Sequence, residues 1–253
     1  MRVFKAFLSA IVATAIVLVT FPAAATGFIW STPVDVHLTG QDAFDPVVTV
    51  DSTGLVTAVW FQSDGSNFVI RSSTSQSGGV WSTPVTLSEP GGDALDPQLT
   101  VDSTGLVTAV WHRDNGTNTI IQSRTSQSGG AWSTPTVDLS APGQSAAESQ
   151  VTVSSAGLVT AVWTRSNGSN RIVQSRTSQS GGAWSTPTAD LSAPGQTAAA
   201  PQVTVDSTGL VTAVWTRNNG SNDIIQSRTS QSGGAWSTPT ADLSAPGQTA
   251  AAP

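Results

Sequence analysis

A tryptophan-marked repeat runs through almost the whole chain of 253 residues. Trp30, Trp81, Trp132, Trp184 and Trp236 follow one another at steps of 51, 51, 52 and 52 residues, and each opens a Trp-Ser-Thr-Pro tetrapeptide. A period of this size is typical of solenoids, propellers and bead-like arrays, in which each repeat is one supersecondary unit. The repeat therefore constrains the fold more strongly than any other feature of the sequence.

One repeat resolves into four strands separated by turn residues. In the last complete unit the expected strands are residues 202–206, 210–216, 224–229 and 236–243. Ser-Thr-Gly, Asn-Gly and Gly-Gly stand between them and are typical of tight turns. No stretch after residue 26 has a convincing helical period. The pattern predicts an antiparallel, four-stranded sheet for each unit.

The second strand is apolar on both faces, because Val211, Ala213 and Trp215 alternate with Leu210 and Val214. A strand that is buried on both faces lies between two layers. Proline recurs within the fourth strand of every unit, and because proline has no N–H to donate, it marks an edge strand. These features favour an all-β propeller of four-stranded antiparallel blades over a β-solenoid or a row of sandwiches.

The two ends of the repeat do not match. Five Trp-Ser-Thr-Pro strands accompany four sets of inner strands, so residues 30–36 are expected to form an extra N-terminal outer strand, and residues 236–253 a partial unit. About four complete blades are expected. Three outcomes stay open: a four-bladed ring with a surplus strand, an incomplete ring, or self-association through the unpaired end strands.

Residues 1–25 have the pattern of a secretory signal peptide. Arg2 and Lys5 precede an apolar run over 6–21, and three alanines end the segment. The run is shorter than the roughly 20 residues that a membrane span needs. We therefore expect a propeller domain over 26–253 that is secreted, extracellular or periplasmic, with no membrane span after cleavage.

Composition narrows the chemistry. The chain has no cysteine, which excludes disulfides and thiolate metal sites. Ten Lys and Arg against sixteen Asp and Glu give a formal net charge of −6, and no basic stripe is present, so a nucleic-acid partner is not expected.

Few side chains suit a metal. Two carboxylates three residues apart, Asp42 and Asp45 in the first unit and Asp93 and Asp96 in the second, suit a calcium ion, but Asp before Pro is also a common way to start a turn. His37 and His112 fall at unrelated repeat positions and are expected to be surface histidines. We expect no metal site and no cofactor.

A recurring octapeptide precedes the fourth-strand tryptophan of each unit. It reads Thr-Ser-Gln-Ser-Gly-Gly-Val/Ala-Trp, with Gln76, Gln127, Gln179 and Gln231 at its third position. This resembles the Asp-box of sialidase-like (BNR-repeat) propellers, a Ser/Thr-x-Asp-x-Gly-x-Thr-Trp motif, with glutamine in place of aspartate. The resemblance implies a propeller fold and a structural turn.

The same resemblance implies catalytic residues that this chain lacks. Sialidases resemble one another in an arginine triad and a Tyr–Glu nucleophile pair, and the chain has no tyrosine. Its only glutamates, Glu89 and Glu148, lie in connecting segments. Arg124, Arg176 and Arg228 recur at one repeat position, which predicts a ring and not a triad. We therefore predict that the protein is not an enzyme, because function has to be argued from the site.

The predicted function is binding of a glycan or another surface polymer by an exported, non-catalytic propeller. The alternatives are a structural scaffold that contacts a cell-surface protein, and a truncated, inactive relative of sialidase-type glycoside hydrolases. Arginine and asparagine recur around the loops between the second and third strands, and both bind hydroxyls or carboxylates. The predicted ligand-binding residues are Arg113, Asn115, Asn118, Arg165, Asn167, Asn170, Arg217, Asn219 and Asn222.

Overall fold

The computed structural model describes residues 31–250 except 78, 135, 187, 239, 240, 246 and 248. The chain divides into two units, residues 1–35 and residues 36–253. The predicted signal peptide lies outside the described residues, as does Trp30. Residues 31–36 form no strand, so the predicted N-terminal outer strand is not found in its described part.

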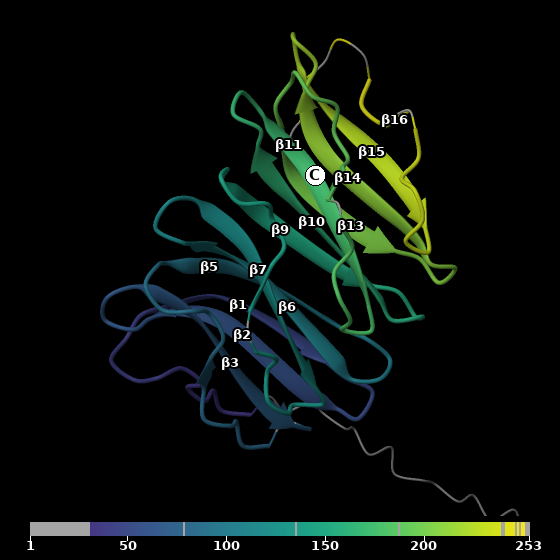
Figure 1. Ribbon diagram of the computed structural model, residues 1–253. Coiled ribbons are helices and arrows are strands. Elements are labelled where there is room, and N and C mark those ends of the chain that lie inside the picture. The colour runs from purple at the N-terminus through teal and green to yellow at the C-terminus, as the bar shows by residue number, and fades with distance from the viewer. Residues whose placement is uncertain are drawn as a thin grey trace, which may run out of the picture. The chain divides into compact units, whose positions relative to one another are not determined.

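Four antiparallel sheets of four strands each make up the described part of the second unit, and no described residue is helical (Figure 1). We number these sheets as blades 1 to 4 in chain order. The strands of blades 1 and 2 are β1 (Ala43–Val50), β2 (Leu55–Ser63), β3 (Phe68–Gln76), β4 (Val85–Thr86), β5 (Ala94–Val101), β6 (Leu106–Asp114), β7 (Thr119–Gln127) and β8 (Val137–Asp138). Those of blades 3 and 4 are β9 (Ala146–Val153), β10 (Leu158–Ser166), β11 (Arg171–Gln179), β12 (Ala189–Asp190), β13 (Ala198–Val205), β14 (Leu210–Asn218), β15 (Asp223–Gln231) and β16 (Ala241–Asp242). The predicted all-β propeller with four blades is confirmed.

Each fourth strand is shorter than the sequence predicts. In blade 1, Trp81 makes a single bridge to Ser75, and regular pairing resumes only at β4. Pro84 stands between the two pairings, and it has no N–H to contribute to a ladder. The outer edge of the blade therefore has a regular ladder over two residues only, in addition to the bridge at Trp81.

Each first strand is longer than predicted and contains a β-bulge. In blade 4 the strand begins at Ala198, where the sequence predicted residue 202. The bulge residue has a left-handed backbone, which is uncommon outside glycine and turns its side chain away from the regular alternation. The φ angles are +47° at Asp45, +51° at Asp96, +57° at Glu148 and +49° at Ala200.

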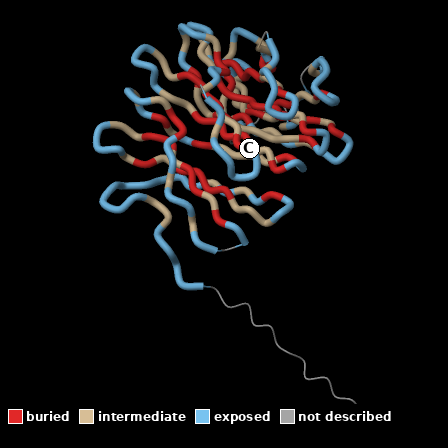
Figure 2. Tube along the Cα trace, turned by 60° about the horizontal axis from the view of Figure 1, so that its bottom comes forward, coloured by how far each residue is buried: buried red, intermediate tan, exposed pale blue. Residues whose placement is uncertain are grey.

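Successive blades pack through one repeated apolar interface. We call the side of a blade that faces the next blade its leading face, and the opposite side its trailing face. Between blades 1 and 2, fully buried side chains of both faces form one cluster: Val59, Ile70 and Leu87 with Ala94, Ala109 and Trp111. Equivalent clusters join blades 2 and 3 and blades 3 and 4. Buried residues accordingly concentrate in the strand interiors (Figure 2), and the prediction of a second strand buried on both faces is confirmed.

In each blade, the glutamine of the octapeptide forms a hydrogen bond to the turn between the first and second strands. Gln76 Nε2 donates to the Thr53 carbonyl at 2.9 Å, which ties the β3–β4 turn to the β1–β2 turn. Gln127, Gln179 and Gln231 make the same contact in the other blades. The glutamine therefore replaces the aspartate of the motif as a hydrogen-bonding group of the turn.

Candidate functional site

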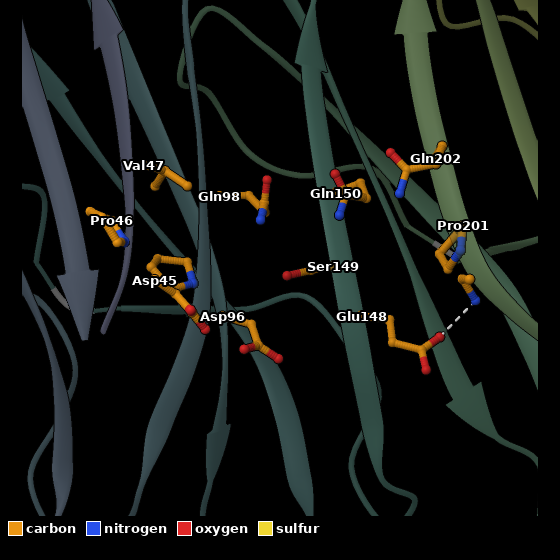
Figure 3. A pocket seen from close by; sticks show the side chains of 12 residues that line it. Asp45, Pro46, Val47, Asp96, Gln98, Glu148, Ser149, Gln150, Pro201 and Gln202 are labelled. Atoms are coloured by element: carbon orange, nitrogen blue, oxygen red, sulfur yellow. Dashed lines mark hydrogen bonds between the residues drawn. The ribbon is translucent and has the colours of Figure 1, made fainter. Parts of the chain in front are cut away.

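The first strands of all four blades line one cavity of about 690 Å³ (Figure 3). Each blade contributes its bulge residue and the two residues that follow it. Asp45, Asp96 and Glu148 are the bulge residues of blades 1, 2 and 3, and Ala200 takes that position in blade 4. Three consecutive blades thus place a carboxyl group at the same position around one cavity.

Glu148 is the most firmly held of the three carboxylates. Its Oε1 accepts hydrogen bonds from Arg171 Nη1 at 3.0 Å and Nη2 at 3.2 Å. Its Oε2 accepts the backbone N–H of Ala200 at 2.8 Å, across the boundary between blades 3 and 4. These contacts fix the orientation of the carboxylate at the cavity wall.

Asp96 has a histidine neighbour. His112 Nδ1 lies 3.4 Å from Asp96 Oδ2, and only 14 % of the histidine side chain is exposed. Burial lowers the pKa of His112 below its ordinary value of 6.5, while the Asp96 carboxylate opposes that change. The prediction of a surface histidine at this position is therefore wrong, because β6 turns the imidazole toward the bulge of β5.

The rest of the cavity wall is polar next to the carboxylates. Gln98, Gln150 and Gln202 follow the bulges of blades 2 to 4, and their amides offer both donors and acceptors. Pro46 and Pro97 come directly after the two aspartates and leave no N–H unpaired at the irregular step of the ladder. Such a wall suits a ligand rich in hydroxyl groups.

The asparagines and arginines predicted to bind ligand do not line this cavity. Asn115 Oδ1 accepts the backbone N–H groups of Thr117 and Asn118 at 3.0 and 2.9 Å, so it closes its own turn. Asn167 and Asn219 do the same in the next two blades.

The predicted arginines lie near the ends of the second strands β6, β10 and β14, directly before these loops. Arg113 Nε donates to the Glu89 carbonyl at 3.0 Å and holds the link between blades 1 and 2. Arg165 and Arg217 take the equivalent positions in blades 3 and 4. Of the asparagines at the end of each turn (Asn118, Asn170 and Asn222), Asn170 lines a smaller hollow of about 440 Å³ between blades 3 and 4. A role of these residues in binding stays a prediction.

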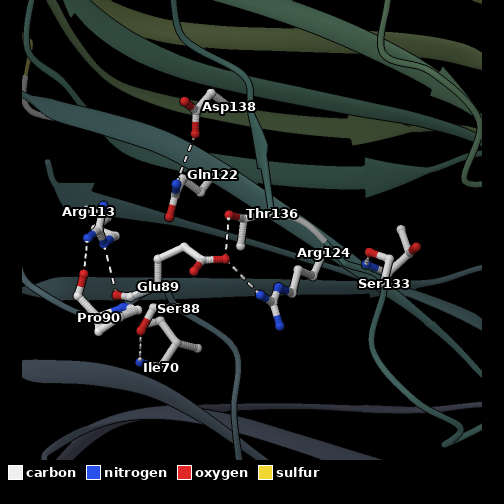
Figure 4. A network of polar contacts seen from close by, with 11 residues as sticks. Ile70, Ser88, Glu89, Pro90, Arg113, Gln122, Arg124, Ser133, Thr136 and Asp138 are labelled. Atoms are coloured by element: carbon white, nitrogen blue, oxygen red, sulfur yellow. Dashed lines mark hydrogen bonds and ion pairs between the residues drawn. The ribbon is translucent and has the colours of Figure 1, made fainter.

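Glu89 belongs to a structural network outside the cavity (Figure 4). Its Oε1 accepts the Thr136 hydroxyl at 3.1 Å and Arg124 Nη2 at 3.0 Å. The Thr136 hydroxyl, with Arg124 beside it, holds the pKa of the Glu89 carboxyl below its ordinary value. This network connects the blade 1–2 link to the outer strands of blade 2 and leaves Glu148 as the one glutamate at the cavity.

The sequence singles out the carboxyl residues of the cavity, but it predicts them outside the first strands. The sequence predicts turn formers or calcium ligands at Asp45 and Asp96 and a connecting segment at Glu148, because the predicted first strand begins four residues too late. Within the described ranges, no cluster of three or more His, Asp or Glu side chains has a geometry that would hold a metal ion. Aligning the units on the residue before Pro46, Pro97 and Pro201 would have revealed the shared position.

Neither a protein-family model nor a curated protein matches this sequence. Solved structures do match its fold. A protein of unknown function from Dyadobacter fermentans is 13 % identical with a TM-score of 0.58, covering 78 % of this chain and 68 % of its own. An endo-arabinase from Bacteroides thetaiotaomicron is 14 % identical with a TM-score of 0.50, covering 79 % and 81 %. An alpha-L-arabinanase from Penicillium chrysogenum, complexed with arabinobiose, is 14 % identical with a TM-score of 0.52, covering 79 % and 66 %.

These neighbours correct the prediction that the protein is not an enzyme. Two of the three are arabinan-directed enzymes that share the propeller fold, so the fold points toward enzymatic relatives. The missing tyrosine argues only against sialidase chemistry and not against acid–base chemistry by carboxyl groups. The neighbours show the propeller fold, and they do not single out the sialidase-like family. No helix in the described part of the chain has the length and apolar character of a membrane span.

Proposed function

We propose that this protein is a glycoside hydrolase whose substrate is a polysaccharide bound in the cavity of the first strands. The observation that carries the proposal is the convergence of Asp45, Asp96 and Glu148 on that cavity from three consecutive bulges. Most glycosidases use a pair of carboxyl groups that flank the scissile bond. The arabinan-directed neighbours share this fold and support a glycan as the substrate class.

The contacts of each carboxyl group suggest its role. Glu148 is oriented by Arg171 and the Ala200 amide as a carboxylate, which suits a general base that activates water. Asp45 and Asp96 stand at the equivalent positions of the preceding blades, and one of them is assigned as the general acid that protonates the leaving oxygen. The cavity volume of about 690 Å³ lies within the usual range for sites that bind small ligands.

The experiment is a screen of the purified chain against polysaccharides, with arabinan first, by release of reducing ends. We expect Glu148→Gln, and one of Asp45→Asn and Asp96→Asn, to lower kcat by at least about 100-fold, because each of these two changes removes a proton-transferring group. Asp190→Asn is the matched control, since Asp190 Oδ1 accepts Gln174 Nε2 on the outer strand, away from the cavity, and asparagine keeps that acceptor.

A second measurement separates the acid from the base. An aryl glycoside with a good leaving group needs little protonation, so the variant of the general acid retains activity on it while the Glu148→Gln variant does not. Full activity of all three cavity variants would refute the site. Saturable glycan binding without any bond cleavage would refute hydrolysis and leave the glycan-binding function that we predicted from the sequence. Export by residues 1–25 would bring the protein to such a substrate and stays a prediction.

A further inference from the structure

The leading face of blade 4 has the same composition as the three that are buried. Its residues are Val214, Ile225 and Leu243. In blades 1 to 3 the equivalent valine, isoleucine or valine, and leucine are all 0 % exposed. In blade 4 the valine and isoleucine are half-buried and Leu243 is 58 % exposed. The described residues therefore leave one apolar leading face uncovered.

The trailing face of blade 1 is the matching surface. Ala43 is exposed, whereas its equivalents Ala94, Ala146 and Ala198 are 0 to 2 % exposed. Val48 is 67 % exposed, although the equivalent side chains of blades 2 to 4 pack against the interface clusters.

Trp60 limits the open part of this trailing face. It is only 4 % exposed, and its Nε1 donates to Gln62, whose amide also bonds to the backbone of Leu38. The open part is therefore strand β1, with Val48 at its centre and Val50, which is 57 % exposed, toward its end.

We propose that the leading face of blade 4 binds the trailing face of blade 1 of a second copy of this chain. The repeat supports this contact, because each of the three internal interfaces already joins a leading face to a trailing face. Their packing shows that the partner of a Val-Ile-Leu surface in this protein is an Ala-Ala-Trp surface. A second copy supplies the exposed part of the equivalent surface, Ala43 and Val48 of β1, whereas its Ala58 and Trp60 are only 7 % and 4 % exposed within their own chain.

This contact is heterologous, since two different faces meet. Each added copy leaves one leading and one trailing face open at the ends of the assembly, so the assembly grows with concentration unless the rotation closes a ring. An isologous dimer, in which like faces meet, predicts a different response to substitution.

The experiment uses one exposed residue on each face. Leu243→Asp blocks the leading face of blade 4 and Val48→Asp blocks the trailing face of blade 1. Both side chains are exposed in one chain, so folding is preserved. Val80→Asp is the matched control, because Val80 is 95 % exposed in the β3–β4 turn and belongs to neither face. Mass is measured by sedimentation over a wide range of concentrations, with circular dichroism to verify folding.

We expect the unchanged chain and the Val80→Asp variant to self-associate, and each face variant alone to remain a monomer. A mixture of the two face variants retains one intact interface and is expected to stop at a heterodimer. A chain that stays monomeric at every concentration would overturn the proposal. So would self-association that only one of the two face substitutions abolishes, because that result indicates contact between like faces.

Discussion

At the scale of the residue, His112 shows how one substitution changes the chemistry of a repeat position. The equivalent residues of blades 3 and 4 are Thr164 and Thr216, which carry no ionisable group. In blade 2 the imidazole is largely buried beside Asp96, and burial lowers its pKa. A buried neutral histidine makes folding sensitive to pH, because the unfolded chain takes up the proton first.

We therefore predict that the chain loses stability as the pH falls below about 6.5, the pKa of an unperturbed histidine. The loss grows until the pH reaches the lowered pKa of the folded state, where both states are protonated. His112→Thr removes this contribution. The free energy of unfolding of the variant, relative to that of the unchanged chain, should therefore rise as the pH falls from 7 to 5. Urea titrations at several pH values measure it, and a difference that does not vary with pH contradicts the prediction.

At the scale of the element, leucines at equivalent positions of two fourth strands have different environments. Leu139 and Leu243 follow nearly identical fourth-strand sequences, yet Leu139 is 0 % exposed and Leu243 is 58 % exposed. The difference arises from the next blade, which contributes an alanine and tryptophan surface over Leu139. Nearly identical strand sequences therefore contribute unequally to stability.

Leu139→Ala is expected to lower the free energy of unfolding by about 2 to 5 kcal/mol, because it creates a cavity in a packed interface. Leu243→Ala is expected to cost less than about 0.5 kcal/mol, as is usual for exposed positions. Denaturant titrations test the pair at a protein concentration low enough to keep the chain monomeric. Equal costs at the two sites would show that the environments of the blades are the same.

At the scale of the whole molecule, stability depends on neighbouring blades. Blades 3 and 4 arise from units that differ at eight of 52 positions, and their β10–β11 and β14–β15 pairs have the same register. Blade 3 is packed on both faces, whereas blade 4 has only its trailing face in a buried cluster of the described residues. In repeat proteins such nearest-neighbour packing supplies much of the stability.

Amide hydrogen exchange should therefore be faster in β14 and β15 than in β10 and β11, because local opening of blade 4 exposes less buried surface. We expect the protection factors to differ at paired positions such as Val162 and Val214, although both are the same residue type in the same ladder. Mass spectrometry of peptides from the two blades in dilute solution measures the difference. Equal protection would mean that the blades unfold as one cooperative unit.

The sequence by itself determined the four-stranded structure of each blade, because the signals for its strands and turns all lie within one repeat. Tryptophan spacing, turn glycines and alternating apolar residues are all contained within one period, so the number of blades and the order of their strands followed from the pattern. The proline of the fourth strand also identified the edge correctly. Its effect on pairing was underestimated, since the missing N–H leaves only two paired residues in β4.

The candidate site was decided by the tertiary structure. Asp45, Asp96 and Glu148 are about one repeat apart in the sequence, and no local pattern shows that a bulge turns each of them into one cavity. The sequence left open whether the outer faces of blades 1 and 4 are covered, because their residues are of types that are buried elsewhere in the chain. Burial and convergence depend on which surfaces are brought together in space, and a repeated sequence carries the same local information at every copy.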